Sequence, residues 1–495
     1  MKPIGTITAC FPHVDQETRN ILQSVMDEAK DYNDFAELLC KKAIKESLPD
    51  LAIYFAHYHC YNLGKYNFLG QLIEANVKTD LTQIFSLVAA QRRGEDVEWS
   101  EYQKAMFSAL KHVENDWMAS HIYIAWRVMI EVFQLPEAAV DNETLNILTS
   151  KIENDEEYGF FLSQVHRITA MRLYNEGNLK EAIKYNDLAI SQAQKYDDKE
   201  ALCILLFQKA NKVKHLNFNE ALSFLELAKN IVEELGYVDG KGLSQHELGH
   251  IAMAKGEFEK AIDYQNQYLA IRLDQGLPVG FLRLVIAFIY NQKGDGKTAL
   301  KFILESRNDY GKGAKVLDQI QETWAYLLLD KIDEVSQCLE KARASSLKSG
   351  DETNLAYIHF LEGLLAKKQG DLSSALFSFG NALEVYERTQ FGVTINFTLL
   401  EMVDAEIDLI APKKDSAGLE VSGPWMRKLL DHVDEKDLPG TAAQANLLLA
   451  KFRFKQGRVK ESRKLVEQVL DISEKTGMLY LKDKAEILVP DLLLS

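Results

Sequence analysis

The chain has 495 residues, 47% hydrophobic and 26% charged, which is the composition of an ordinary globular protein with a sizeable core and excludes a disordered one. Only 9 prolines and 27 glycines occur over this length, which favours an almost wholly helical protein. The net charge of −16, without a concentrated run of basic residues, argues against nucleic acid and an anionic membrane surface as partners and more easily accommodates a basic protein.

Cysteine usage and hydropathy indicate the compartment. The five cysteines are widely scattered and form no CxxC pair, which is typical of reduced thiols rather than a disulfide framework. No secretory leader and no run of about 20 apolar residues is visible, so we expect a cytoplasmic protein. The cysteines are Cys10, Cys40, Cys60, Cys203 and Cys338.

Residues 1–155 are predicted to be helical without a clear repeat, and we interpret them as a cap or bundle at one end of the chain. One helix would begin near Phe35, with Asp34 as its N-cap. Further helices are predicted at Leu81–Gln91, Trp99–Val113 and Trp117–Phe133.

The stretch from residue 51 to 64 is apolar on nearly all sides and predicts a buried helix. It contains His57 and His59, which are two positions apart and therefore fall on different helix faces. They cannot form an i, i+4 metal-binding pair, so we interpret them as histidines that are hydrogen-bonded within the protein or face solvent.

From residue 156 to 495 a repeat is visible. A polar turn is followed by a small residue and then an apolar one, and successive small-residue positions are 36 to 40 residues apart. A longer gap before the last position predicts an irregular insertion near residues 410–424. Glycines in the turns would supply the positive backbone dihedral that ends a helix. The small-residue positions are Ala182, Ala221, Ala261, Ala299, Val335, Ala375 and Ser462, with valine the bulkiest among them.

Leu248, Gly249, Gly256, Phe258 and Ala261 resemble the tetratricopeptide repeat family, in a form whose period is near 40 residues. The resemblance implies an all-α fold, an α-solenoid in which about eight helix-turn-helix units wind into a right-handed superhelix. It also implies a non-enzymatic adaptor or regulator that binds a protein or peptide in its concave groove, with no cofactor. A closely related alternative is a peptide-sensing regulatory protein.

Residues 246–250 read His-Glu-Leu-Gly-His, which matches the HExxH pattern of zinc proteases. His246 and His250 would share one helix face, and Glu247 would be the general base of a zinc-dependent hydrolase. The pattern is incomplete, because no third ligand is evident and no strand nearby could hold a substrate. We therefore favour a repeat helix that carries two histidines, with no metal, and keep the hydrolase as the alternative.

The family resemblance also implies which side chains face the groove. In such repeats they lie three residues before and one residue after the small residue at which two helices cross. The predicted partner-binding residues are Arg167, Met171, His246, His250, Leu284, Phe288, Phe360, Leu364, Leu447 and Lys451.

Overall fold

The computed structural model describes residues 5–92, 97–131, 150, 156–175, 178–214, 217–310, 315–349, 352–389, 392–410, 420–436 and 438–488. All regular structure in these residues is helical, and consecutive helices pack against one another in tandem pairs. The predicted all-α solenoid of helix pairs is therefore confirmed. In the described part, eight such pairs run from α10 to α25, as the repeat period predicts.

The chain divides into two compact units, which are described separately. The first contains residues 1–214, 219–247 and 268–278, and the second contains residues 215–218, 248–267 and 279–495. The sequence predicts a division near residue 155, between the cap and the repeats. This division does not correspond to the boundary between the two compact units, and it stays a prediction. Within the described residues, no helix is both long enough and apolar enough to cross a bilayer.

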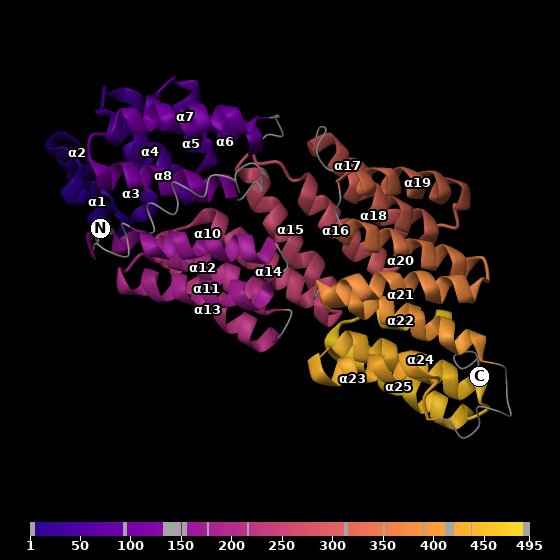
Figure 1. Ribbon diagram of the computed structural model, residues 1–495. Helices are drawn as coiled ribbons and strands as arrows, with labels where there is room; N and C mark the ends of the chain where they lie inside the picture. The colour runs from indigo at the N-terminus through magenta and orange to yellow at the C-terminus, as the bar shows by residue number, and fades with distance from the viewer. Residues whose placement is uncertain are drawn as a thin grey trace. The chain divides into compact units, whose positions relative to one another are not determined.

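The first unit begins with a group of helices that precedes the repeats (Figure 1). The observed helices agree with the predicted ones to within a few residues, and the predicted buried helix is α4. The bounds are α1 Gly5–Cys10, α2 Gln16–Glu28, α3 Tyr32–Lys45, α4 Asp50–Asn62, α5 Tyr66–Glu74, α6 Gln83–Arg92, α7 Trp99–Lys111 and α8 Asp116–Glu131. Short 3-10 helices cover Phe11–His13, Asp80–Thr82 and Glu156–Phe161.

The repeats of the first unit follow. Their helices are α10 Leu162–Asn175, α11 Leu179–Lys195, α12 Lys199–Val213 and α13 Phe218–Leu235. Helices α14 Val238–Lys255 and α15 Phe258–Asp274 contribute residues to both units.

One predicted helix start is wrong. The N-cap of α3 is Asp31 rather than Asp34, because the Asp31 side chain accepts a hydrogen bond of 2.8 Å from the Asp34 backbone N–H. Tyr32, which is buried, therefore belongs to the first turn of the helix. The apolar pattern alone placed the start at Phe35, one turn too late.

Three histidines of the first unit are buried among aromatic rings. His57 lies 3.0 Å from the carbonyl oxygen of Ile53, and His59 contacts the hydroxyl of Tyr32. Burial lowers the pKa of His57 to about 4 and that of His121 to about 4. Burial, together with neighbouring His121, lowers the pKa of His59 to about 3. All three are therefore neutral packing residues at pH 7, and burial excludes the solvent-facing role that the sequence left open for His57 and His59.

We expect the free energy of unfolding to fall as the pH is lowered from about 6.5 towards 4, because the unfolded histidines, with pKa near 6.5, take up protons that the folded ones refuse. Urea unfolding followed by circular dichroism at several pH values measures this slope. In His59→Phe the slope should be smaller. The matched control is His112→Gln, which should keep the wild-type slope because the side chain of His112 is 55% exposed. An equal slope in wild type and His59→Phe would contradict the assignment of His59 as a buried neutral residue.

The second unit consists of repeats from α14 onward. Its further helices are α16 Gly280–Lys293, α17 Gly296–Tyr310, α18 Lys315–Leu328, α19 Ile332–Ser349, α20 Glu352–Lys368, α21 Leu372–Arg388, α22 Gly392–Leu409, α23 Pro424–Lys436, α24 Pro439–Lys455, α25 Val459–Thr476 and α26 Tyr480–Leu488. Helices α18 to α22 lie side by side in chain order (Figure 1). Most of the predicted insertion, residues 411–419, lies outside the described residues.

The repeat positions have the structural roles that their chemistry predicts. All seven small-residue positions are fully buried, so each second helix packs closely at that point. The turn residues Gly256, Gly294, Gly370 and Gly457 have φ values between +78° and +94°. Asp330 adopts φ +59° in the turn that has no glycine, a conformation that aspartate tolerates better than most residues.

Two glycines allow the first and second helices of a pair to cross closely. A Cβ on Gly249 would lie 2.5 Å from Gln265 Nε2, and a Cβ on Gly363 would lie 2.4 Å from the ring of Phe379. Neither distance is compatible with a methyl group. The predicted packing role of Gly249 is thereby confirmed, and Gly363 has the same role in the α20–α21 pair.

Gly363→Ala should lower the thermal unfolding midpoint, because its methyl group overlaps a fully buried ring and overpacking costs roughly 1–3 kcal/mol. Gly380→Ala is the matched control: it lies inside α21 with no atom within 4 Å of the place its methyl group would take, so it should gain up to about 1 kcal/mol of helix propensity. Thermal unfolding of the two variants should therefore shift in opposite directions. A Gly363→Ala protein as stable as wild type would contradict the close crossing.

Candidate functional site

A cavity of about 480 Å³ lies inside the second unit. Its wall is formed mainly by the first helices of successive pairs, α14, α16, α18, α20, α22 and α24, with α26 completing it. On α14, α16, α18 and α20 the lining residues lie in the C-terminal halves, whereas on α24 they lie near the N-terminus. A volume of this size is within the usual range of ligand sites, about 300–1,000 Å³.

The cavity is partly closed where the two ends of the second unit meet. A Cβ on Gly440, at the start of α24, would lie 2.5 Å from the Lys255 carbonyl oxygen and 2.6 Å from Gly256 Cα. Asn396 Nδ2 donates a hydrogen bond of 3.4 Å to the Ala254 carbonyl oxygen. We call this contact of the α14–α15 turn with α22 and α24 the seam. Without it the first helices would line an open groove.

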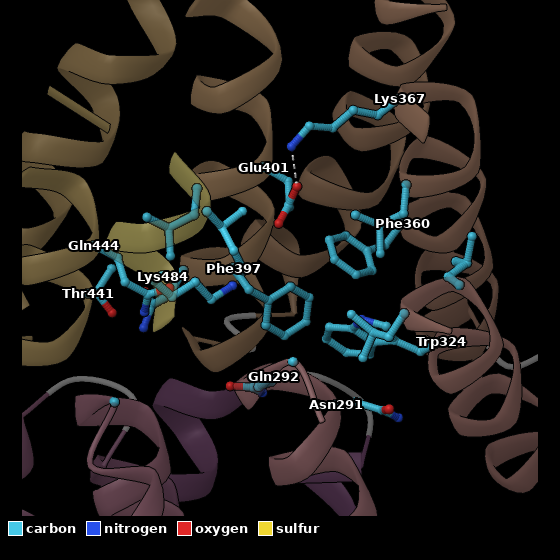
Figure 2. A pocket seen from close by; sticks show the side chains of 18 of the residues that line it. Asn291, Gln292, Trp324, Phe360, Lys367, Phe397, Glu401, Thr441, Gln444 and Lys484 are labelled. Atoms are coloured by element: carbon cyan, nitrogen blue, oxygen red, sulfur yellow. Dashed lines mark hydrogen bonds and ion pairs between the residues drawn. The ribbon is translucent and has the colours of Figure 1, made fainter. Parts of the chain in front are cut away.

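Three aromatic rings, of Trp324, Phe360 and Phe397, form an apolar floor of the cavity (Figure 2). The Phe360 and Phe397 ring centroids are 4.7 Å apart, and that of Trp324 lies 5.2 Å from Phe360 and 5.3 Å from Phe397. These distances and the inclined ring planes are typical of favourable aromatic contacts. Rings packed in this way present a rigid apolar surface that suits a bulky apolar group.

Two residues that line the cavity at the end of α16 each have a buried side-chain atom without a hydrogen-bond partner among the described residues. Asn291 is 2% exposed and donates through Nδ2 to the carbonyl oxygen and to the side chain of Gln321, each at 3.0 Å. Its acceptor, Oδ1, has no hydrogen-bond partner among the described residues, and neither does the buried donor Nε2 of Gln292. Leaving buried polar atoms unpaired is costly, so a ligand that satisfies them would bind more tightly.

A network of ion pairs lies at the rim of the cavity. Lys367 Nζ lies 2.6 Å from Glu401, and Lys451 Nζ lies 2.7 Å from Asp404 and 2.8 Å from Asp408. Lys367 also contacts Asp404. Burial lowers the pKa of Lys367, but Glu401 and Asp404 outweigh this and hold it above its ordinary value. Lys367 therefore remains charged, and Glu401 and Asp404 compensate its charge.

Lys484, on α26, differs from the other cations that line the cavity. Its ammonium has no hydrogen bond and no ion pair with any described residue. Figure 2 shows it on the side of the cavity where Thr441 and Gln444 lie.

The predicted groove residues are distributed over both units. Phe360 and Leu364 line the cavity, and the Phe288 ring centroid is 5.8 Å from that of Trp324, just behind the floor. Leu284 and Leu447 are buried in helix packing. The part of each in partner binding stays a prediction.

The remaining predicted residues have other described contacts. Lys451 belongs to the rim network. Arg167 is buried in the first unit and donates to Gln164 Oε1 at 3.3 Å, while Met171 is half-buried on the same helix, α10. His246 packs against the Tyr268 ring at 5.4 Å, and His250 is half-buried on α14.

Five lining residues were not predicted from the sequence: Trp324, Phe397, Asn291, Gln292 and Lys484. Asn291 and Gln292 lie one helical turn after Phe288, so extending the offset rule by a turn would have found them. Lys484 has no such signal, because α26 follows the last helix pair and reaches the cavity only through the tertiary fold.

The HExxH glutamate has a structural role. Glu247 is buried and accepts hydrogen bonds from Lys214 Nζ at 2.9 Å and from Asn211 Nδ2 at 3.0 and 3.2 Å. Burial raises the pKa of Glu247, but Lys214 and Asn211 outweigh it, so the pKa lies below its ordinary value. Among the described residues, no group of three histidine, cysteine, aspartate or glutamate side chains could hold a metal ion. Nothing in this part of the chain supports the hydrolase alternative.

Purified protein should contain no stoichiometric zinc by elemental analysis, since Glu247 is engaged by Lys214 and Asn211 and no third ligand is in reach among the described residues. The His246→Ala, His250→Ala double variant should have the same metal content as wild type and an unchanged helical signal. Zinc at one equivalent that is lost in the double variant would contradict this interpretation of the motif.

Comparisons with known proteins agree with the helix-pair architecture. The family model described as "Tetratricopeptide repeat" matches residues 244–275, which cover most of α14 and all of α15. No curated protein matches the sequence.

Several solved structures are similar, at low identity. A Rap protein complexed with Competence and Sporulation Factor is 13% identical, with a TM-score of 0.46, over 73% of this chain and 99% of that one. Aspartyl phosphate phosphatase F from Bacillus subtilis is 14% identical, with a TM-score of 0.45, over 72% and 94%. Yeast Tom70 is 12% identical, with a TM-score of 0.34, over 94% and 96%. These likenesses are too remote to transfer a function.

Proposed function

We propose, from the premise that this chain is a tetratricopeptide-repeat protein, that it is a non-catalytic binding protein whose second unit takes up a short segment of a partner protein or peptide. Helical-repeat folds of this kind are typical of protein-interaction scaffolds. The ligand would occupy the cavity and anchor a bulky apolar side chain on the floor of Trp324, Phe360 and Phe397.

The observation that carries this proposal is the pair of unpartnered amide atoms beside the floor. Asn291 Oδ1 is an acceptor and Gln292 Nε2 is a donor, and they belong to consecutive residues. An extended peptide offers one N–H and one C=O at each residue, which is the complementary set. A purely apolar ligand would leave both atoms unsatisfied, so the site favours a peptide over a lipid or hydrocarbon.

A regulatory form of this function is supported by the seam. The cavity is lined by residues on both sides of it, Ala254 and Gly256 on one side and Asn396 and Thr441 on the other. A ligand that touches both sides binds better when the seam is closed, and it would therefore shift the second unit towards the closed arrangement. This is the behaviour expected of a peptide-sensing protein.

The predicted groove residues and the predicted compartment are part of this proposal. We assign Phe360 and Leu364 to ligand contact and leave the other eight predicted groove residues as predictions. The five free cysteines are compatible with a reducing compartment, and we propose the cytoplasm.

When the protein is incubated with a pool of synthetic hexapeptides that have free C-termini, we expect the bound peptides to be rich in Phe, Leu and Trp. Mass spectrometry identifies the bound peptides. Retained peptides should change the fluorescence of Trp324, and Trp324→Phe should lose that change. Phe360→Ala or Leu364→Ala should weaken binding about tenfold or more, since a truncated anchor site costs about 1.5 kcal/mol or more.

The matched control is Phe377→Ala, because Phe377 lies on the second helix α21 and is 71% exposed. Circular dichroism establishes that each variant is folded, and Leu364→Ala remains informative if loss of the buried Phe360 unfolds the protein. Binding that survives both cavity substitutions would place the site elsewhere and overturn the proposal.

A further inference from the structure

Helix α26, the last helix that the structure describes, packs on both sides of the seam. A tight turn joins it to α25, where Gly477 has φ +74° and Ser473 Oγ donates a hydrogen bond of 2.8 Å to the Met478 carbonyl oxygen. Its buried residues share one apolar cluster with residues of α14 and α15, on one side of the seam, and of α24 and α25, on the other. The helix therefore bridges the two ends of the second unit. Its members of the cluster are Tyr480, Leu481 and Ala485.

Tyr480 makes the contact that crosses the seam. Its ring centroid is 4.5 Å from that of Phe258, in the first turn of α15, and its hydroxyl oxygen lies 2.9 Å from the place that a Cβ on Gly256 would take. The residue is only 1% exposed. Helix α26 itself packs on α24 and α25. Opening the seam would therefore separate the Tyr480 ring from the α14–α15 turn and expose its hydroxyl to water.

The closed seam leaves buried polar atoms without hydrogen bonds. The Tyr480 hydroxyl makes none with any described residue. Neither carboxylate oxygen of Glu259, in the first turn of α15, makes one either, although Lys293 Nζ lies 3.3 Å from Oε1. A buried hydroxyl without a partner destabilises the closed arrangement, because water would bond to it once the seam opened. Closure is therefore stabilised by apolar packing and opposed by an unpaired hydroxyl.

The length of α26 makes its position depend on this packing. The helix has 9 residues, and isolated helices shorter than about 12–15 residues are marginal in water. The helix pairs α18 to α22, in contrast, share a large apolar core of their own that does not include α26. Release of α26 is therefore a local opening, which requires less free energy than unfolding of the unit.

We propose that α26 is a strap that controls closure of the cavity: the seam is closed when Tyr480 is seated against the α14–α15 turn and opens when Tyr480 is released. The unpaired hydroxyl keeps the two arrangements close in free energy, so a ligand of the cavity can shift the equilibrium between them. The inference rests on the proposed function only for this effect of a ligand, since the strap acts on the seam in the free protein as well.

Hydrogen exchange of the full chain without ligand, followed by mass spectrometry, tests the strap. Peptides covering residues 250–262 and 438–446 report on the two sides of the seam, and peptides from α18 report on the rest of the unit. Tyr480→Phe keeps the ring and removes the hydroxyl, so exchange at both sides of the seam should slow about fivefold or more. Tyr480→Ala removes the ring, and exchange there should become about tenfold faster or more. Exchange in α18 should not change.

Two control variants separate the strap from general effects on stability. Tyr386, on α21, is fully buried, and its hydroxyl also makes no hydrogen bond with the described residues. Tyr386→Phe therefore removes the same kind of group away from the seam and should leave exchange at the seam unchanged. Leu479→Ala, beside Tyr480 in the sequence but 64% exposed, should have the exchange rates of wild type.

Failure of the strap is distinguishable from failure of the proposed function. Equal exchange at the seam in wild type and Tyr480→Phe overturns the strap, whether or not the protein binds peptides. Unchanged exchange in Tyr480→Ala overturns it as well, and Tyr480→Phe alone decides if the alanine variant does not fold. If exchange follows the expected order but no peptide binds, the strap stands and the proposed function fails.

Discussion

The contact between Gly256 and Gly440 is the constraint on which the second unit depends. A linear array of helix pairs contacts only its neighbours, and its first helices line an open groove. Here two glycines, one in the turn after α14 and one at the start of α24, bring backbone against backbone where a single methyl group would lie 2.5 to 2.8 Å from the opposite chain segment. The seam closes one side of the groove and so forms a partly closed cavity. It also brings α26 to the wall, so the unpaired Lys484 and the aromatic floor face one space although they come from distant parts of the sequence.

The chain as a whole has a negative net charge, whereas the residues that line the cavity leave one positive charge uncompensated. The net charge of −16 favours a basic partner for the protein as a whole. Inside the second unit, however, lysines and carboxylates neutralise one another at the rim and, among the described lining residues, a single ammonium is left over. Long-range attraction and local recognition are separate requirements, because exposed charges more than about a Debye length apart are screened whereas a desolvated ion pair is not.

Local features were predictable and long-range closure was not. The small-residue positions such as Ala261 and Ala375 and the turn glycines report contacts within one helix pair, so their spacing identified the helix pairs and their close crossings. Of the predicted groove residues, Phe360 and Leu364 line the cavity, which on α16 and α20 extends one turn further, to Asn291 and Lys367. Asp31 was missed as a cap because two aspartates precede the same apolar run. Lys484 could not be found at all, because its environment is created by the seam, which joins residues whose proximity no local pattern encodes.

The seam also determines at which stage of protein synthesis the cavity can form. Gly256 and Gly440 are separated by 184 residues, so at synthesis rates of about 5–20 residues per second roughly ten to forty seconds pass between their emergence from the ribosome. During that interval α16 to α22 can pair with their neighbours, yet their inner faces, with Trp324 and Phe397, have nothing opposite them. The nascent chain thus presents an apolar strip that is hidden in the finished protein. It is in this window, rather than after folding, that the chain is most exposed to chaperone capture and to aggregation.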